Sequence, residues 1–102
     1  MDYQNSMEII LHAGNAKALI LEAIEQPEKG NFEQANKMVE DANQEVLAAH
    51  EQHQSLLVQL ANGEMVEVDL MMVHAEDHLN SANEEILLAR HLIKVYKKLE
   101  EK

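Results

Sequence analysis

Cysteine is absent from the 102-residue chain, which excludes a disulfide framework, a thiolate zinc site and a thiol nucleophile. Aromatic residues are scarce, with no Trp, one Phe and two Tyr, so base-stacking platforms are not expected. Proline occurs once and glycine three times, a composition typical of helical proteins. Basic residues are also few: 8 Lys and Arg against 19 Asp and Glu give a formal net charge of −11. This balance argues against nucleic acids and anionic membranes as partners, and it permits a basic protein partner.

The chain is long enough for one domain, residues 1–102, and too short for two. A domain of this size buries a limited core, so association with copies of itself is expected. No apolar run approaches the roughly 18 residues of a membrane span. The first five residues lack the basic and apolar regions of a signal peptide. We therefore expect a cytoplasmic protein without direct membrane insertion.

Apolar residues recur at intervals of three and four along three segments, which predicts three helices at about residues 4–25, 32–60 and 69–100. A Pro-Glu-Lys-Gly cluster separates the first two segments, and an Asn-Gly pair follows the second. These breaks predict an all-α fold, a three-helix antiparallel bundle.

Several local signals refine this expectation. Asn31 is predicted to cap the second helix with Gln34 as its capping-box partner, and Asp69 suits the positive start of the third helix. The alternation of residues 65–68 indicates an extended stretch before the third helix. Gly14 costs about 1 kcal/mol relative to Ala in mid-helix, so we expect a tight helix crossing there, the alternative being a buried polar contact of Asn15.

The third helix has an unusually wide apolar arc made of two adjacent stripes. One stripe contains Met71, Ala75, Leu79, Ala82, Ile86, Ala89 and Ile93. The other contains Leu70, His74, Asp77, Ser81, Leu88, Leu92, Val95 and Leu99. Together they exceed the roughly 100° that packing within one small bundle uses. The second stripe therefore indicates an oligomer interface.

Two histidines four residues apart, His74 and His78, lie with Asp77 and Ser81 on one face of this helix. The pair could clamp zinc, but Ala75 and Asp77 fit neither the H-E-x-x-H nor the H-x-x-E-H pattern of metalloproteases. A second histidine pair, His50 and His53, could also hold a metal, although boundary groups of a helix interface are the simpler interpretation.

Two non-metal interpretations remain open for His74 and His78. A neutral imidazole is a nucleophile near pH 7 and can form a covalent phosphoryl intermediate. No glycine-rich phosphate loop is present, so the donor would be another protein and not ATP. Alternatively, both histidines line a polar patch at a helix interface.

The stretch Val73-His74-Ala75-Glu76-Asp77-His78-Leu79 resembles V-H-A-Q-D-H-L, the signature of lactose/cellobiose-type enzyme IIA proteins of the bacterial sugar phosphotransferase system. Residues 13–17 resemble the A-G-N-A-[RK] segment of that family, and residues 30–35 its G-[DN]-F-E-x-A segment. Residues 49–54 resemble its A-H-x-x-Q-[TS] region. The segments follow the family's order over nearly the whole chain.

The resemblance implies a three-helix protomer that assembles as a homotrimer. It implies that His74 accepts a phosphoryl group from the histidine phosphocarrier protein and passes it to enzyme IIB during uptake and phosphorylation of a disaccharide of the lactose, cellobiose or chitobiose class. The chain would thus be a phosphotransferase component with a phosphohistidine intermediate. The resemblance also implies that Asp77 meets its symmetry mates around one divalent cation per trimer, usually Mg²⁺.

The chain departs from the family pattern at Glu76, which stands where the signature has Gln, and at Asn80 and Ser81. Glu76 adds a negative charge beside the phosphorylation site. The role of His78 stays open between orienting the phosphate and a structural one. The alternative function is a helical oligomerisation or metal-binding module without transfer activity.

Overall fold

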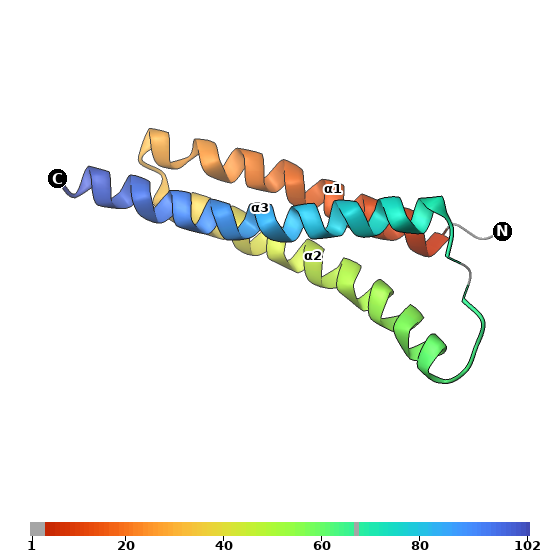
Figure 1. Ribbon diagram of the computed structural model, residues 1–102. Helices are drawn as coiled ribbons and strands as arrows, with labels where there is room; N and C mark the ends of the chain where they lie inside the picture. The colour runs from red at the N-terminus through yellow and green to blue at the C-terminus, as the bar shows by residue number, and fades with distance from the viewer. Residues whose placement is uncertain (1–3, 67) are drawn as a thin grey trace.

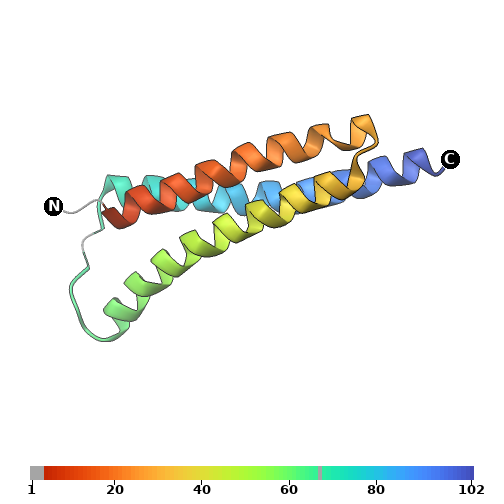
Figure 2. The same ribbon diagram turned by 180° about the vertical axis from the view of Figure 1, so that it is seen from behind.

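The computed structural model describes residues 4–66 and 68–102, which form three long helices and one short 3₁₀ helix (Figure 1). The elements are α1 (Gln4–Glu25), η1 (Pro27–Lys29), α2 (Phe32–Ala61) and α3 (Leu70–Glu100). Each long helix runs antiparallel to the one before it in the chain (Figures 1 and 2). The predicted all-α, three-helix bundle is confirmed, and the helix boundaries agree with the predicted ones to within about one residue.

No strand occurs among the described residues. In the stretch expected to be extended, residues 65, 66 and 68 form an irregular connection between α2 and α3. Glu67, in the middle of that stretch, lies outside the described residues, as do residues 1–3. None of the described helices is long and apolar enough to cross a membrane.

The core runs along the middle of the bundle and consists of alanine and branched aliphatic side chains. Its members are Ile9, Ala13, Ala16, Ile20 and Ala23 of α1, Ala35, Val39, Ala42, Val46 and Ala49 of α2, and Ala75, Leu79, Ala82, Ile86, Ala89 and Ile93 of α3. The α3 set matches the first stripe predicted for that helix, apart from the half-buried Met71. Small side chains at these positions allow the helix axes to approach closely.

The stripe of α1 that contains Met7, Gly14 and Leu21 faces outward. The prediction of a tight helix crossing at Gly14 is wrong within the protomer, because a Cβ on Gly14 would meet no atom within 4 Å in the described part of the chain. The alternative, a buried contact of Asn15, is also wrong, since Asn15 is exposed. Two apolar stripes adjoin on α1, and the one containing Ala13 and Ala16 faces the bundle.

Helix α2 leaves the bundle in its C-terminal half. The apolar repeat of this segment continues to Leu60, yet burial ends at Ala49 and Leu60 is 49% exposed. Both views show the C-terminal end of α2 diverging from α1 and α3 (Figures 1 and 2). The divergence opens a space between α2 and the first turns of α3.

Asp69 lies at the start of α3, as expected from the helix dipole, and it also caps the helix, which was not predicted. Asp69 has extended backbone angles, and its carboxylate accepts a hydrogen bond of 2.9 Å from the backbone N–H of Met72. The capping box predicted for α2 is wrong. Asn31 precedes the helix, but its side-chain amide donates to Gln26 at 3.2 Å instead of capping, so Gln34 has no reciprocal partner there.

The connection between α1 and α2 is tied to the far end of α3. The Tyr96 hydroxyl donates a hydrogen bond of 3.1 Å to Glu28 in η1. This hydrogen bond, together with the negative charge of Glu28, raises the pKa of Tyr96 above its ordinary value. Gly30 closes the turn with φ of 80°, a conformation that favours glycine.

Candidate functional site

The predicted nucleophile, His74, lies in the second turn of α3, whose start is fixed by the Asp69 cap. The helix places His78 one turn later on the same face, and the two Nε2 atoms are 3.1 Å apart. The ring planes are nearly perpendicular, at 82°, with centroids 4.4 Å apart. His74 is exposed and His78 is half-buried. The structure therefore brings together the two histidines that the spacing predicted, with one Nε2 donating a proton to the other.

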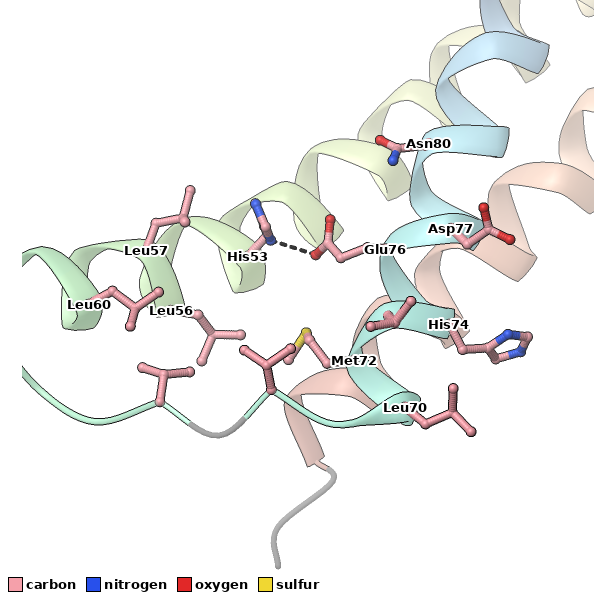
Figure 3. A pocket seen from close by; sticks show the side chains of 13 residues that line it. His53, Leu56, Leu57, Leu60, Leu70, Met72, His74, Glu76, Asp77 and Asn80 are labelled. Atoms are coloured by element: carbon pink, nitrogen blue, oxygen red, sulfur yellow. Dashed lines mark ion pairs between the residues drawn. The ribbon is translucent and has the colours of Figure 1, made fainter.

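Asp77, the predicted metal ligand, is exposed on the same side of α3 as His74 (Figure 3). Its carboxylate makes no hydrogen bond or ion pair with another residue in the described part of the chain. Within residues 4–66 and 68–102, no group of three or more acidic, histidine or cysteine side chains could hold a metal ion. Asp77 thus offers a free carboxylate beside His74, and carboxylate oxygen is the hard donor that Mg²⁺ prefers.

Glu76 points to the other side of α3, toward α2 (Figure 3). Its Oε1 lies 2.5 Å from Nδ1 of His53, an ion pair between two half-buried side chains. His50, one turn earlier on α2, contacts Asn83 of α3 through its Nε2 at 3.1 Å. Both α2 histidines are therefore boundary groups, and each is engaged by its own partner on α3. The His53–Glu76 contact was missed from the sequence, where only the departure of Glu76 from the family pattern marked the position.

A groove of about 610 Å³ opens where α2 diverges from the start of α3. Its walls are mostly aliphatic. They contain Leu56, Leu57 and Leu60 of α2, Val66 and Val68 of the connection, and Leu70, Met72 and Val73 of α3. The polar end contains His53, His74, Glu76, Asp77 and Asn80 (Figure 3). The groove joins an apolar surface to the side chains that carry the candidate chemistry.

The second stripe of α3 is exposed, as an interface with another molecule would require. Its aliphatic members Leu70, Leu88, Leu92, Val95 and Leu99 are between 42 and 84% exposed in the protomer. On α1, Met7, Leu11 and Leu21 are exposed in the same way. A second groove, of about 310 Å³, runs between Leu21 and Leu88 and joins the two helices. This exposed α1/α3 face, defined by these eight residues, is larger than scattered surface side chains explain.

Residues 4–97 match the family model of the lactose/cellobiose-specific IIA subunit of the phosphotransferase system. The lichenan-specific phosphotransferase enzyme IIA component of Bacillus subtilis is 39% identical over 94 residues, which cover 92% of this chain and 86% of that protein. The lactose-specific EIIA component of Staphylococcus epidermidis is 37% identical over 91 residues, 89% of this chain and 88% of that protein.

Solved structures of similar proteins share the fold. The cellobiose-specific enzyme IIA of Bacillus anthracis superposes with a TM-score of 0.94 at 33% identity, covering 100% of this chain and 95% of that one. A chain of the IIA(chitobiose)–HPr complex of Escherichia coli gives 0.75 at 27% identity, covering 95% and 94%. The family match and these relatives confirm what the motif resemblance predicted: the chain belongs to the lactose/cellobiose-specific IIA subunits, the phosphotransferase components of bacterial sugar uptake.

Proposed function

We propose that the protein is a cytoplasmic phosphocarrier in which His74 accepts a phosphoryl group from the histidine phosphocarrier protein and passes it to enzyme IIB. The sugar served would be a disaccharide of the lactose, cellobiose or chitobiose class. The observation that carries the proposal is the placement of His74, an exposed imidazole whose Nε2 is 3.1 Å from a second imidazole. A nucleophile for protein-to-protein transfer must be reachable and must keep a lone pair free.

The histidine pair supports the chemistry of the step. If Nε2–H of His78 donates to Nε2 of His74, the attacking lone pair is held on that nitrogen and the proton of His74 is on Nδ1. In the transfer, the hydrogen bond from His78 opens to release this lone pair, and the P–N bond of the donor phosphohistidine breaks as the P–Nε2 bond of His74 forms. The electron pair of the broken bond returns to the donor imidazole. Nε2–H of His78 is then free to donate to a phosphoryl oxygen.

The surroundings of His74 suit two successive partners. Leu70, Met72 and Val73 provide apolar docking surface on the first turns of α3, and methionine adapts to more than one partner. The net charge of −11 favours a donor with a basic rim. The IIA(chitobiose) relative was solved in complex with HPr, which supports a donor of that kind.

We also propose that three protomers assemble through the exposed α1/α3 face, with Asp77 near the axis. Three carboxylates brought together repel one another unless protons or a hard cation compensate. Asp77 has no partner among the described residues, so its carboxylate is available to a Mg²⁺ ion shared by the trimer. The metal would compensate negative charge and take no part in the transfer itself.

Phosphorylation by purified components tests the transfer. The protein is incubated with labelled phosphoenolpyruvate, enzyme I and the histidine phosphocarrier protein. We expect an acid-labile, base-stable phosphate on the wild type that disappears in His74→Ala. His91→Ala is the matched control, since His91 is an exposed histidine of the same helix with no polar contact in the described residues. An unlabelled wild type would contradict the proposal and favour a helical oligomerisation or metal-binding module.

A further inference from the structure

The His53–Glu76 pair is the last polar contact between α2 and α3 before α2 diverges. Three such contacts follow one another along α2: Glu40 with Arg90 at 3.1 Å, His50 with Asn83 at 3.1 Å, and His53 with Glu76 at 2.5 Å. Beyond His53, the α2 side chains Leu56, Leu57 and Leu60 form the wall of the groove (Figure 3). The pair therefore fixes the closed end of the groove that reaches His74.

The geometry of the pair requires a proton between the two atoms. Nδ1 of His53 and Oε1 of Glu76 are both buried atoms, and neither has a hydrogen-bond partner of good geometry within residues 4–66 and 68–102. Two lone pairs 2.5 Å apart would repel, so a proton must lie on the nitrogen or between the atoms. An Nδ1–H of His53 that points at the Glu76 carboxylate satisfies both atoms. The negative charge of Glu76 is then compensated at close range by this N–H.

Because Glu76 lies close to His74, compensation of its negative charge affects the phosphorylation of His74. Glu76 is two residues from His74 on the same turn of α3, and both side chains line the same groove. A phosphoryl group on His74 adds up to two negative charges to that turn. A buried carboxylate is screened less by salt than an exposed one, so an uncompensated Glu76 would disfavour the phosphorylated form.

We infer that His53 and Glu76 are positioning residues of the phosphorylation site: the imidazole N–H on α2 compensates the carboxylate on α3 and holds the turn that carries His74. The family signature has a neutral Gln at position 76, and the A-H-x-x-Q-[TS] region has Gln at position 53. This chain has an acid and a base there, facing one another. The inference rests on the proposed function, because it concerns how readily His74 accepts the phosphoryl group.

The equilibrium of phosphoryl exchange between the histidine phosphocarrier protein and this protein is the measurement that tests the inference. For His53→Gln, which leaves Glu76 uncompensated, we expect the equilibrium to shift toward the donor by about three- to tenfold. Glu76→Gln should leave the phosphorylated fraction equal or higher, because the negative charge is removed. The double variant H53Q/E76Q, which places a neutral pair on the two helices, should return to within about twofold of the wild type.

The directions of these equilibrium shifts distinguish charge compensation from a purely structural role, in which the pair acts only as a clamp between α2 and α3. A clamp alone predicts that H53Q and E76Q both lower the phosphorylated fraction, and that result would overturn the inference. An unchanged equilibrium in H53Q, or a double variant as impaired as H53Q, would overturn it too. If H53Q does not fold, His53→Lys and E76Q decide the matter: the Lys ammonium also compensates the Glu76 carboxylate and should keep the wild-type equilibrium.

The chain offers a matched control in His12 and Glu45. These side chains form an ion pair of 2.6 Å between α1 and α2, with about the same exposure, and neither lines the groove. His12→Gln should lower the melting temperature and leave the phosphoryl equilibrium within about twofold; an equal shift in the control would contradict a site-specific effect. Failure of the wild type to be phosphorylated at all would defeat the proposed function, and with it this inference. If the wild type is phosphorylated normally but the variants do not shift the equilibrium in the predicted directions, only the inference about His53 and Glu76 is wrong.

Discussion

At the scale of single residues, the candidate site depends on which nitrogen carries which proton. His74 and His78 share one hydrogen bond between their Nε2 atoms, so only one of them has a lone pair at that position, and that lone pair accepts the hydrogen bond. In the sequence, the role of His78 stayed open between orienting the phosphate and a structural one. The 3.1 Å contact favours a direct role in presenting His74.

The substitution His78→Gln tests that role. Because His74 keeps its nucleophile, phosphorylation should persist, but its rate should fall about tenfold, as expected for loss of a hydrogen bond to a group that becomes charged. The rate of label transfer from the histidine phosphocarrier protein is the measurement. His91→Gln on the same helix should retain the wild-type rate, and an unaltered rate in His78→Gln would show that His78 is structural.

At the scale of the elements, the start of α3 sets the site because the nucleophile lies in its second turn. Asp69 caps this start through Met72, whereas Asn31 at the start of α2 is engaged by Gln26. Both residues are good N-cap types, and the sequence predicted a capping box only at Asn31. The side chain of Asn31 found a partner across the turn, a contact that local pattern does not encode.

The two helix starts differ in stability in a measurable way. Asp69→Ala should lower the free energy of unfolding by about 1 kcal/mol, since it leaves a backbone N–H without its acceptor. Asn31→Ala should cost less than about 0.5 kcal/mol, because no helix cap is lost. Urea unfolding followed by circular dichroism compares them. Equal losses in the two variants would contradict the assignment of the cap.

At the scale of the whole molecule, the bundle leaves one apolar face without cover. The α1/α3 face contains leucines such as Leu21 and Leu88 that are 67 and 63% exposed. A monomer of this size rarely exposes a continuous face of this kind. Assembly into a trimer would bury it, and the polar start of α3 would lie at one end of the interface.

A charge placed on this face should dissociate the assembly without unfolding the protomer. Leu88→Glu is expected to sediment as a monomer and to keep its helical circular dichroism, because Leu88 is outside the protomer core. Leu47→Glu is the control, since Leu47 is 47% exposed on α2 and does not belong to the α1/α3 face. The same sedimentation mass for both variants would contradict an interface on α1 and α3.

The axial role of Asp77 predicts a gain in stability on its removal. Asp77→Leu replaces three repelling carboxylates by apolar side chains, so the melting temperature of the trimer should rise in the presence of a chelator. The wild type should recover part of that difference when Mg²⁺ is added. A variant that melts at or below the chelated wild type would show that Asp77 does not meet its symmetry mates.

The sequence by itself determined the helices, their boundaries and the shared face of His74 and His78. These depend on the 3.6-residue period and on end signals, which are local properties of the chain. The resemblance of the heptapeptide around His74 identified the family, and the match over residues 4–97 confirms it. The Gly14 crossing failed because it depended on the packing of helices that are distant in the chain. The capping box failed because Gln26, across the preceding turn, accepts the hydrogen bond of the Asn31 side chain.

Only the tertiary structure decided which stripe of each helix became core, where α2 leaves the bundle and which partner each charged side chain found. A stripe is a property of one helix, but its burial depends on the orientation of the other two, which is set by packing along their whole length. The sequence likewise shows an acid, Glu76, close to the nucleophile His74 but does not show which residue pairs with it. The folded bundle places His53 against it, 23 residues earlier in the chain, because α2 and α3 pack antiparallel at that level.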